Sequence, residues 1–126
     1  MNQKGLRRAL LANAGFCTLS AVTLIAAAGP LATLFGLSQP WILRGIGIGL
    51  LLFAVDIVAT CRGPEISRSK AVYFSAGDFG WVLGSVVLLL VAPLSSQAAA
   101  VVVAVGLVVL AFAVAQVRSI RSARPA

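Results

Sequence analysis

Apolar residues fill this chain in long unbroken runs, and charged residues interrupt them at only a few places. No Lys, Arg, Asp or Glu occurs within residues 9–43 or within residues 79–117. Such runs are too long for one membrane-spanning helix of about 20 residues, and they suit one span, a turn and part or all of another. We therefore predict four transmembrane helices, at about residues 9–28, 41–61, 76–92 and 98–117.

Proline and the polar stretches set the expected boundaries. Gly29 and Pro30 are predicted to end the first span, because proline has no backbone N–H to donate. Apolar residues then recur at helical spacing, which predicts a short helix in the outer interface; they are Leu31, Leu34 and Phe35. Residues 62–75 form the only long polar linker and are expected to be the inner loop. Residues 93–97 are expected to make a tight outer turn.

Composition supports a membrane protein and leaves no room for a separate soluble domain. Of the 126 residues, 60% are hydrophobic and 10% charged, against about 45–50% and about 25% in soluble domains. The basic start and first apolar run resemble a signal peptide, but the run exceeds the ~7–15 residues of a secretory segment. We expect an uncleaved first span and a single all-α membrane domain over residues 1–126, folded as a compact bundle.

The distribution of positive charge predicts the orientation. Ten Lys and Arg face three Asp and Glu, which gives a net charge of +7. Nine of the ten basic residues lie in the amino tail, the 62–75 linker and the carboxyl tail, and only Arg44 lies on the opposite side. The positive-inside rule then predicts that both termini face the cytoplasm of a bacterial inner membrane. Because the basic residues flank apolar runs, we expect them to meet anionic lipid headgroups and not nucleic acid.

Motifs for catalysis or metal binding are absent from the sequence. The chain has no His, no CxxC, no GxSxG and no Walker motif. Gly45, Gly47 and Gly49 form GxGxG inside an apolar span, without the strand and acidic residue of a dinucleotide site. Cys17 and Cys61 have no metal-ligand spacing and are expected to act as apolar filler. We expect no enzyme, no cofactor and no metal site.

Glycine pairs predict close contacts between helices. Gly45 and Gly49 form a GxxxG motif in the second span, and Gly80 and Gly84 form another in the third. In lipid, van der Waals packing takes over from the hydrophobic effect, and small residues let helix backbones approach closely. These faces are expected to meet another helix, within a homo-oligomer or a larger membrane complex.

A layer of polar side chains near the inner side of the membrane is the one constellation that points to chemistry. It comprises Asn13, Asp56 and Asp78, with Arg8 or Arg62 near enough to reach it. One interpretation is an ion or proton site that opens to the cytoplasm. The alternative is structural: Asp56 locks the assembly by bonding Asn13, a backbone group or an arginine, and Asp78 caps the amino end of the third span. Both interpretations stay open at this stage.

Several short motifs resemble those of a group of small uncharacterised bacterial inner-membrane proteins with four spans. The motifs are an amino-terminal Leu-Arg followed by Asn13, Pro40-Trp41, Phe53-Ala54-Val55-Asp56 and Asp78-Phe79-Gly80-Trp81-Val82-Leu83-Gly84-Ser85. The resemblance implies a compact bundle and no particular activity. Four-span small multidrug carriers differ, since they place their essential acid in the first span, where this chain has none.

The sequence therefore favours an accessory or structural membrane subunit that acts through close helix packing. The alternative is a small proton- or cation-coupled carrier or channel that uses Asp56, with Asn13 and Asp78 shaping its site. A membrane-bound enzyme ranks last.

Overall fold

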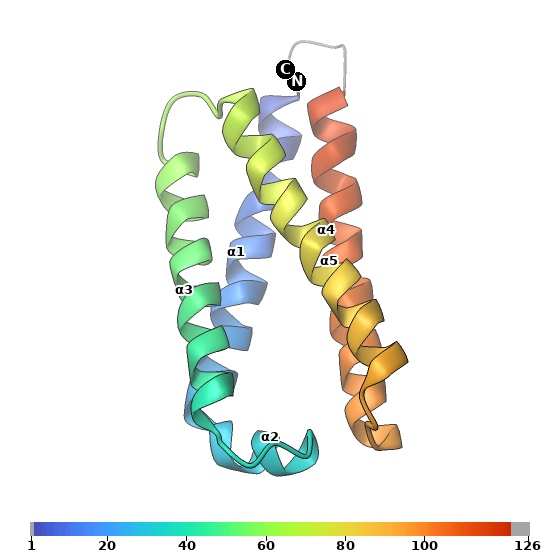
Figure 1. Cartoon of the computed structure of the whole chain (residues 1–126). Helices are drawn as coiled ribbons and strands as arrows, with labels where there is room; N and C mark the ends of the chain where they lie inside the picture. The colour runs from blue at the N-terminus through green and yellow to red at the C-terminus, as the bar shows by residue number, and fades with distance from the viewer. Residues whose placement is uncertain (1, 122–126) are drawn as a thin grey trace.

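The computed structural model describes residues 2–121, and the regular secondary structure in that range is α-helix (Figure 1). The helices are α1 (Gln3–Ala26), α2 (Ala28–Leu34), α3 (Trp41–Cys61), α4 (Arg68–Val91) and α5 (Ser96–Arg121). Four of them, all except the short α2, are long and apolar enough to cross a membrane. The all-α, four-span prediction is confirmed, and the chain is a multi-pass membrane protein.

The long helices run up and down in two neighbouring pairs. Helix α1 packs along α3, α4 packs along α5, and α1 also contacts α5. The start of α1, the end of α5 and the linker between α3 and α4 lie at one end of the bundle, which we call the terminal end (Figure 1). Helix α2 and the turn between α4 and α5 lie at the other end. Arg124 belongs to the predicted basic tail but lies outside the described residues.

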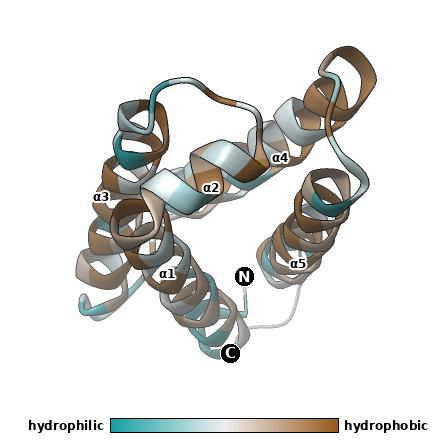
Figure 2. Ribbon diagram, turned by 90° about the horizontal axis from the view of Figure 1, so that it is seen from below, coloured by the Kyte–Doolittle hydropathy of each residue, from teal (hydrophilic) through white to brown (hydrophobic). Residues whose placement is uncertain are grey.

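The outward faces of the long helices are apolar, as a lipid environment requires. Large side chains such as Leu90 and Val91 are 80% and 75% exposed, and Figure 2 shows apolar colouring along the long helices. In water, apolar exposure spread over every long helix would favour aggregation. In a bilayer the same surfaces contact acyl chains, and the backbone groups stay satisfied inside the helices.

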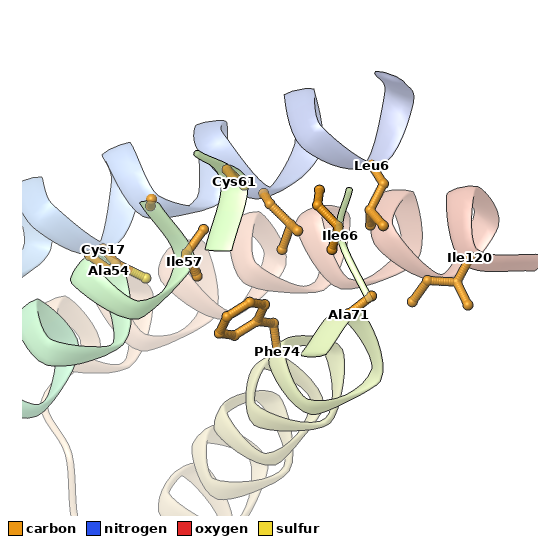
Figure 3. Packing of buried hydrophobic residues seen from close by; sticks show 11 residues of the cluster. Leu6, Cys17, Ala54, Ile57, Cys61, Ile66, Ala71, Phe74 and Ile120 are labelled. Carbon is orange, nitrogen blue, oxygen red and sulfur yellow. The ribbon is translucent and has the colours of Figure 1, made fainter. Parts of the chain in front are cut away.

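The main hydrophobic core lies towards the terminal end of the bundle (Figure 3). Its largest fully buried side chain is Phe74, which meets the ring of Phe53 edge to face at a centroid distance of 5.5 Å. The other buried members are Leu6, Leu10, Ala14, Cys17, Ala54, Ile57, Cys61, Ile66, Ala71 and Ile120. They come from all four long helices and the linker, so this cluster holds the two helix pairs together.

Polar contacts fasten the amino end of α1 to the linker that follows α3. The Gln3 side chain donates to the carbonyl of Ile66 at 3.0 Å and accepts from the Ile66 N–H at 2.9 Å. The Arg7 guanidinium donates to the carbonyl oxygens of Cys61 and, at 3.2 Å, Gly63. These bonds satisfy carbonyl groups that the end of α3 leaves without partners.

The third span begins earlier than the sequence predicts. Helix α4 starts at Arg68, eight residues before the predicted start at 76, and the inner loop is correspondingly shorter than the predicted 62–75. Ser67 caps the helix by accepting a hydrogen bond from the N–H of Lys70 at 3.2 Å. Arg68 and Ser69 at its start are exposed, while Ala71 and Phe74 enter the core. A membrane helix that projects into the headgroup region carries such a polar end. Because this end has the composition of a loop, the sequence does not show that it is helical.

The boundary between the first span and the outer helix also differs from the prediction. Helix α1 ends at Ala26, and Gly29 and Pro30 lie in the first turn of α2. Proline fits there because first-turn N–H groups have no partner within the helix. The predicted short helix after the first span is confirmed. The first and fourth spans are longer than predicted, since α1 starts at Gln3 and α5 covers Ser96–Arg121.

The four glycines predicted to mediate helix packing make no close helix contact within residues 2–121. A methyl group added at Gly45, Gly49, Gly80 or Gly84 would have no heavy atom within 4 Å outside its own helix backbone and neighbours. The close approach occurs at Gly47 instead, where an added Cβ would lie 3.0 Å from the Ala21 carbonyl oxygen. Contacts of the four glycines with another chain stay a prediction.

Gly47→Ala is expected to destabilise the bundle, because its Cβ would also lie 2.9 Å from Ile25 Cγ1 and 3.2 Å from Leu24 Cβ. Overpacking of this kind costs about 1 to 3 kcal/mol. Gly45→Ala is the matched control on the same helix, with open space at its Cβ. Thermal unfolding in detergent should show a lower midpoint for Gly47→Ala alone. Equal midpoints for the two variants would contradict the α1–α3 contact.

Candidate functional site

The Asp78 carboxyl group is the centre of a buried polar cluster that joins three helices. Asn13 of α1 donates from Nδ2 to Asp78 Oδ2 at 2.7 Å, and Gln116 of α5 donates from Nε2 to the same oxygen at 2.9 Å. Asn13 and Gln116 are fully buried, and Asp78 is 4% exposed. The predicted association of Asn13 with Asp78 is thus present in the structure.

Two further side chains complete the cluster. Ser75, one turn before Asp78 on α4, donates from its hydroxyl to Gln116 Oε1 at 3.2 Å. Cys17, one turn after Asn13 on α1, points its thiol at Asn13 Oδ1 at 3.5 Å. Each amide therefore uses its NH₂ group on the carboxyl and its oxygen on a second donor. This arrangement fixes which end of each amide faces Asp78.

The charge of an ionised Asp78 is not matched by a neighbouring cation. Within residues 2–121, the one ion pair in the structure joins Asp56 and Lys70. Every enclosed side-chain nitrogen and oxygen atom in this range nevertheless has a hydrogen-bond partner. The enclosed atoms of the cluster therefore all have hydrogen-bond partners, whereas the charge of the carboxylate has no opposite charge beside it. This is an unusual state for a carboxyl inside a membrane bundle.

The early start of α4 places Asp78 deeper than the sequence predicts. Asp78 is ten residues after Arg68, which corresponds to about 15 Å along the helix axis at 1.5 Å per residue. The alternative that Asp78 caps the amino end of its span is wrong, because Ser67 occupies the cap position. Asp78 is an interior residue of a long helix.

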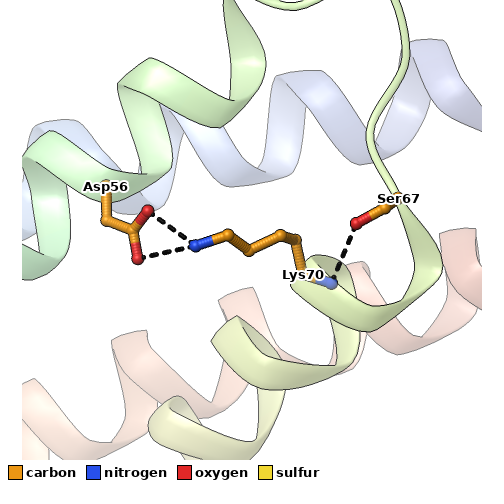
Figure 4. A network of polar contacts seen from close by, with 3 residues as sticks. All are labelled: Asp56, Ser67 and Lys70. Carbon is orange, nitrogen blue, oxygen red and sulfur yellow. Dashed lines mark hydrogen bonds and ion pairs between the residues drawn. The ribbon is translucent and has the colours of Figure 1, made fainter.

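Asp56 does not join this cluster, contrary to the predicted polar layer. Its carboxylate accepts from Lys70 Nζ at 2.8 and 3.1 Å, as Figure 4 shows. The Asp56 and Lys70 side chains are 38% and 44% exposed. Lys70 Nζ also lies 5.5 Å from the centre of the Phe74 ring. The pair bridges the terminal ends of α3 and α4, and Arg8 and Arg62 are not the cations that meet Asp56.

A cavity of about 300 Å³ lies between the four long helices, and Asp78 is the one charged residue among the described residues that line it. The lining is otherwise almost entirely apolar, apart from Cys17 and the Ser20 hydroxyl; the remaining residues are Phe16, Ile46, Gly49, Leu50, Phe53, Gly77, Trp81, Val105 and Val109. The cavity is partly open to the outside of the bundle. Asp78 thus belongs both to the polar cluster and to the wall of this cavity.

Sequence patterns did not indicate Gln116 and Lys70 as partners of the acids, or Ser75 as a partner of Gln116. Gln116 carries a visible signal, because it is the only side chain with a hydrogen-bonding group in residues 98–117. Lys70 falls in a polar segment with the composition of a loop, which hides its position in the first turn of α4. No group of three or more metal-ligating side chains occurs among the residues that the structure describes.

Asn13→Leu is expected to lower the free energy of unfolding by about 1 to 2 kcal/mol, the upper range for polar contacts between membrane helices. It removes one of the two donors to Asp78 Oδ2 and the acceptor of the Cys17 thiol. Asp56→Asn, which weakens a half-exposed ion pair, should change it by less than about 1 kcal/mol. Unfolding in mixed micelles by titration with a denaturing detergent measures both. A larger loss for Asp56→Asn would contradict the assignment of Asp78 as the centre.

Comparisons with known proteins supply no assignment for this site. No family model matches the chain, and no curated protein and no solved structure matches it. The function is therefore inferred from the geometry of the cluster and the cavity.

Proposed function

We propose that this chain is a small membrane carrier or channel in which the Asp78 carboxyl exchanges a proton or a cation. The observation that carries the proposal is a carboxyl that is 4% exposed, has no cation partner among the described residues and lines a cavity between the spans. Intramembrane acids of this kind are typical of ion and proton pathways. In this proposal the carrier or channel uses the carboxyl of Asp78, and not that of Asp56 as the sequence predicted.

The need for a counter-charge gives the mechanism. An ionised carboxyl held away from water is costly unless a positive group neutralises it. A proton on the carboxyl or a cation beside it meets this need, and the two compete for the same oxygen atoms. The Asn13 and Gln116 amides hold Oδ2 in place in either state. Cys17 is the titratable neighbour on α1, and its thiol contacts Asn13 rather than the carboxyl.

Reconstitution into liposomes with a trapped pH-sensitive dye tests the proposal. The wild-type protein should dissipate an imposed pH gradient at least about tenfold faster than Asp78→Asn, because the amide cannot take up or release the proton. Asp56→Asn is the matched control, since it makes the same chemical change outside the cavity. Loss of flux in Asp56→Asn with retention in Asp78→Asn, or a wild-type rate equal to that of empty liposomes, would overturn the proposal.

A second candidate function is that of an accessory or structural subunit in a larger membrane complex or a homo-oligomer. Gly45, Gly80 and Gly84 favour it, because all three are exposed and make no close contact with other described residues of the chain. GxxxG faces that are unused within a chain are available to a helix of another chain.

Gly45→Leu and Gly80→Leu are expected to reduce retention of partners severalfold, because the larger side chain prevents close helix approach. Copurification of the tagged protein from native membranes in a mild detergent measures this. Gly15→Leu is the matched control, since Gly15 also has open space at its Cβ and belongs to no GxxxG pair. Identical sets of copurifying proteins for all three variants would exclude these faces as subunit contacts.

We also propose that the protein resides in a bacterial inner membrane, with the terminal end of the bundle in the cytoplasm and anionic headgroups around it. Support comes from the basic residues at this end, which include Lys4, Arg7, Arg8 and, on α5, Arg118 and Arg121. Arg44 lies in the first turn of α3, towards the opposite end. This asymmetry is the one that orients membrane proteins.

A further inference from the structure

We propose that the cavity between the four long helices binds a small organic cation with an aromatic or other apolar body, whose positive end lies beside Asp78. This inference rests on the proposed function in that both use the Asp78 carboxyl. It goes further by naming the chemical class of the ligand and the part of the bundle that holds the ligand's apolar body.

The charge of the ligand follows from the wall of the cavity. Asp78 is the one charged residue in that wall, and the wall contains no basic residue. Its Oδ2 takes both amide hydrogen bonds, while Oδ1 has no hydrogen-bond partner among the residues that the structure describes. A group that neutralises the carboxylate, and approaches it from the cavity, therefore carries a positive charge.

Aromatic side chains supply the second recognition element. Phe16, Phe53 and Trp81 come from three different helices and line the same cavity as Asp78. Trp81 follows Asp78 by three residues on α4, so both side chains lie on one side of the helix. Aromatic faces attract organic cations such as quaternary ammonium groups, and Trp does so most strongly.

The shortage of oxygen ligands distinguishes an organic cation from a metal ion. Hard cations such as Ca²⁺ take about 6 to 8 oxygen ligands, whereas this wall offers one carboxyl and the Ser20 hydroxyl among apolar side chains. A dehydrated metal ion would lose its water without replacement. An organic cation brings little hydration to lose, and its apolar part gains contact with the wall.

The size of the cavity limits the ligand to a small molecule. A volume of about 300 Å³ lies at the lower end of the ~300 to 1,000 Å³ found for ligand sites. One aromatic ring with a compact ammonium group suits this space. Benzyltrimethylammonium is therefore the probe for the test, and tetramethylammonium, which has the same charge and no ring, is its control.

Fluorescence of Trp81 reports binding directly. The chain has two Trp residues, and Trp41→Phe leaves Trp81, in the cavity wall, as the single reporter. Titration of this variant in detergent should give a saturable change with benzyltrimethylammonium and an affinity at least about tenfold lower for tetramethylammonium. Adding Asp78→Asn should weaken benzyltrimethylammonium binding at least about tenfold, while adding Asp56→Asn should leave it unchanged.

A cavity-filling variant tests the site independently if Asp78→Asn fails to fold. Gly49 lines the cavity and has open space at its Cβ, so Gly49→Leu fills the site without a clash at the Cβ position. It should abolish binding, whereas Gly15→Leu, with equal space at its Cβ and no place in this wall, should not. Binding that survives Gly49→Leu or Asp78→Asn in folded protein would overturn the inference.

The two proposals fail in different ways. Flux that depends on Asp78 without binding of benzyltrimethylammonium would reject the organic cation and leave the carrier or channel standing. Saturable binding that requires Asp78 and Gly49, with no flux in liposomes, would establish the ligand site and reject transport.

Discussion

Two amide groups hold the Asp78 carboxyl at the point where three membrane helices meet, and the other features of the bundle are arranged around that contact. A lipid bilayer offers no hydrogen bonds, so each polar side chain inside it must find its partners on neighbouring helices. Asn13 on α1 and Gln116 on α5 both donate to one oxygen of Asp78 on α4. This contact connects the α4–α5 pair to α1 by directional bonds, in addition to the apolar core.

The bundle is packed differently towards its two ends, and the polar cluster lies between the two regions. Towards the terminal end, Phe74 and Leu6 are fully buried, and Gln3 and Arg7 tie α1 to the linker. Further along the helices, the aromatic side chains of Phe53 and Trp81 line a cavity. A well-packed end thus lies beside a cavity whose wall carries one acid, and the proposed function uses this combination.

The two acids of the polar layer have different roles because their surroundings differ. Asp56 has a cation, Lys70, at 2.8 Å, and both side chains are partly exposed. Such a pair is neutral as a whole and needs nothing more. Asp78 has two neutral amide donors and no cation among the described residues. The charge of Asp56 is thus compensated by Lys70, whereas Asp78 has no positive partner among the described residues.

The amino-acid sequence by itself determined the fold class, because apolar runs of span length can only be helices in a bilayer. It also indicated a polar layer near one side of the membrane, of which Asn13 and Asp78 meet in the structure while Asp56 does not join them. It did not reveal the start of α4 at Arg68, because the polar end of a projecting helix has the composition of a loop. The tertiary structure alone decided which polar groups meet: Lys70 goes to Asp56 and Gln116 to Asp78. The physical reason is that hydropathy reports the depth of a residue along its own helix, whereas partners depend on the rotation and tilt of one helix against another, which packing across the whole bundle sets.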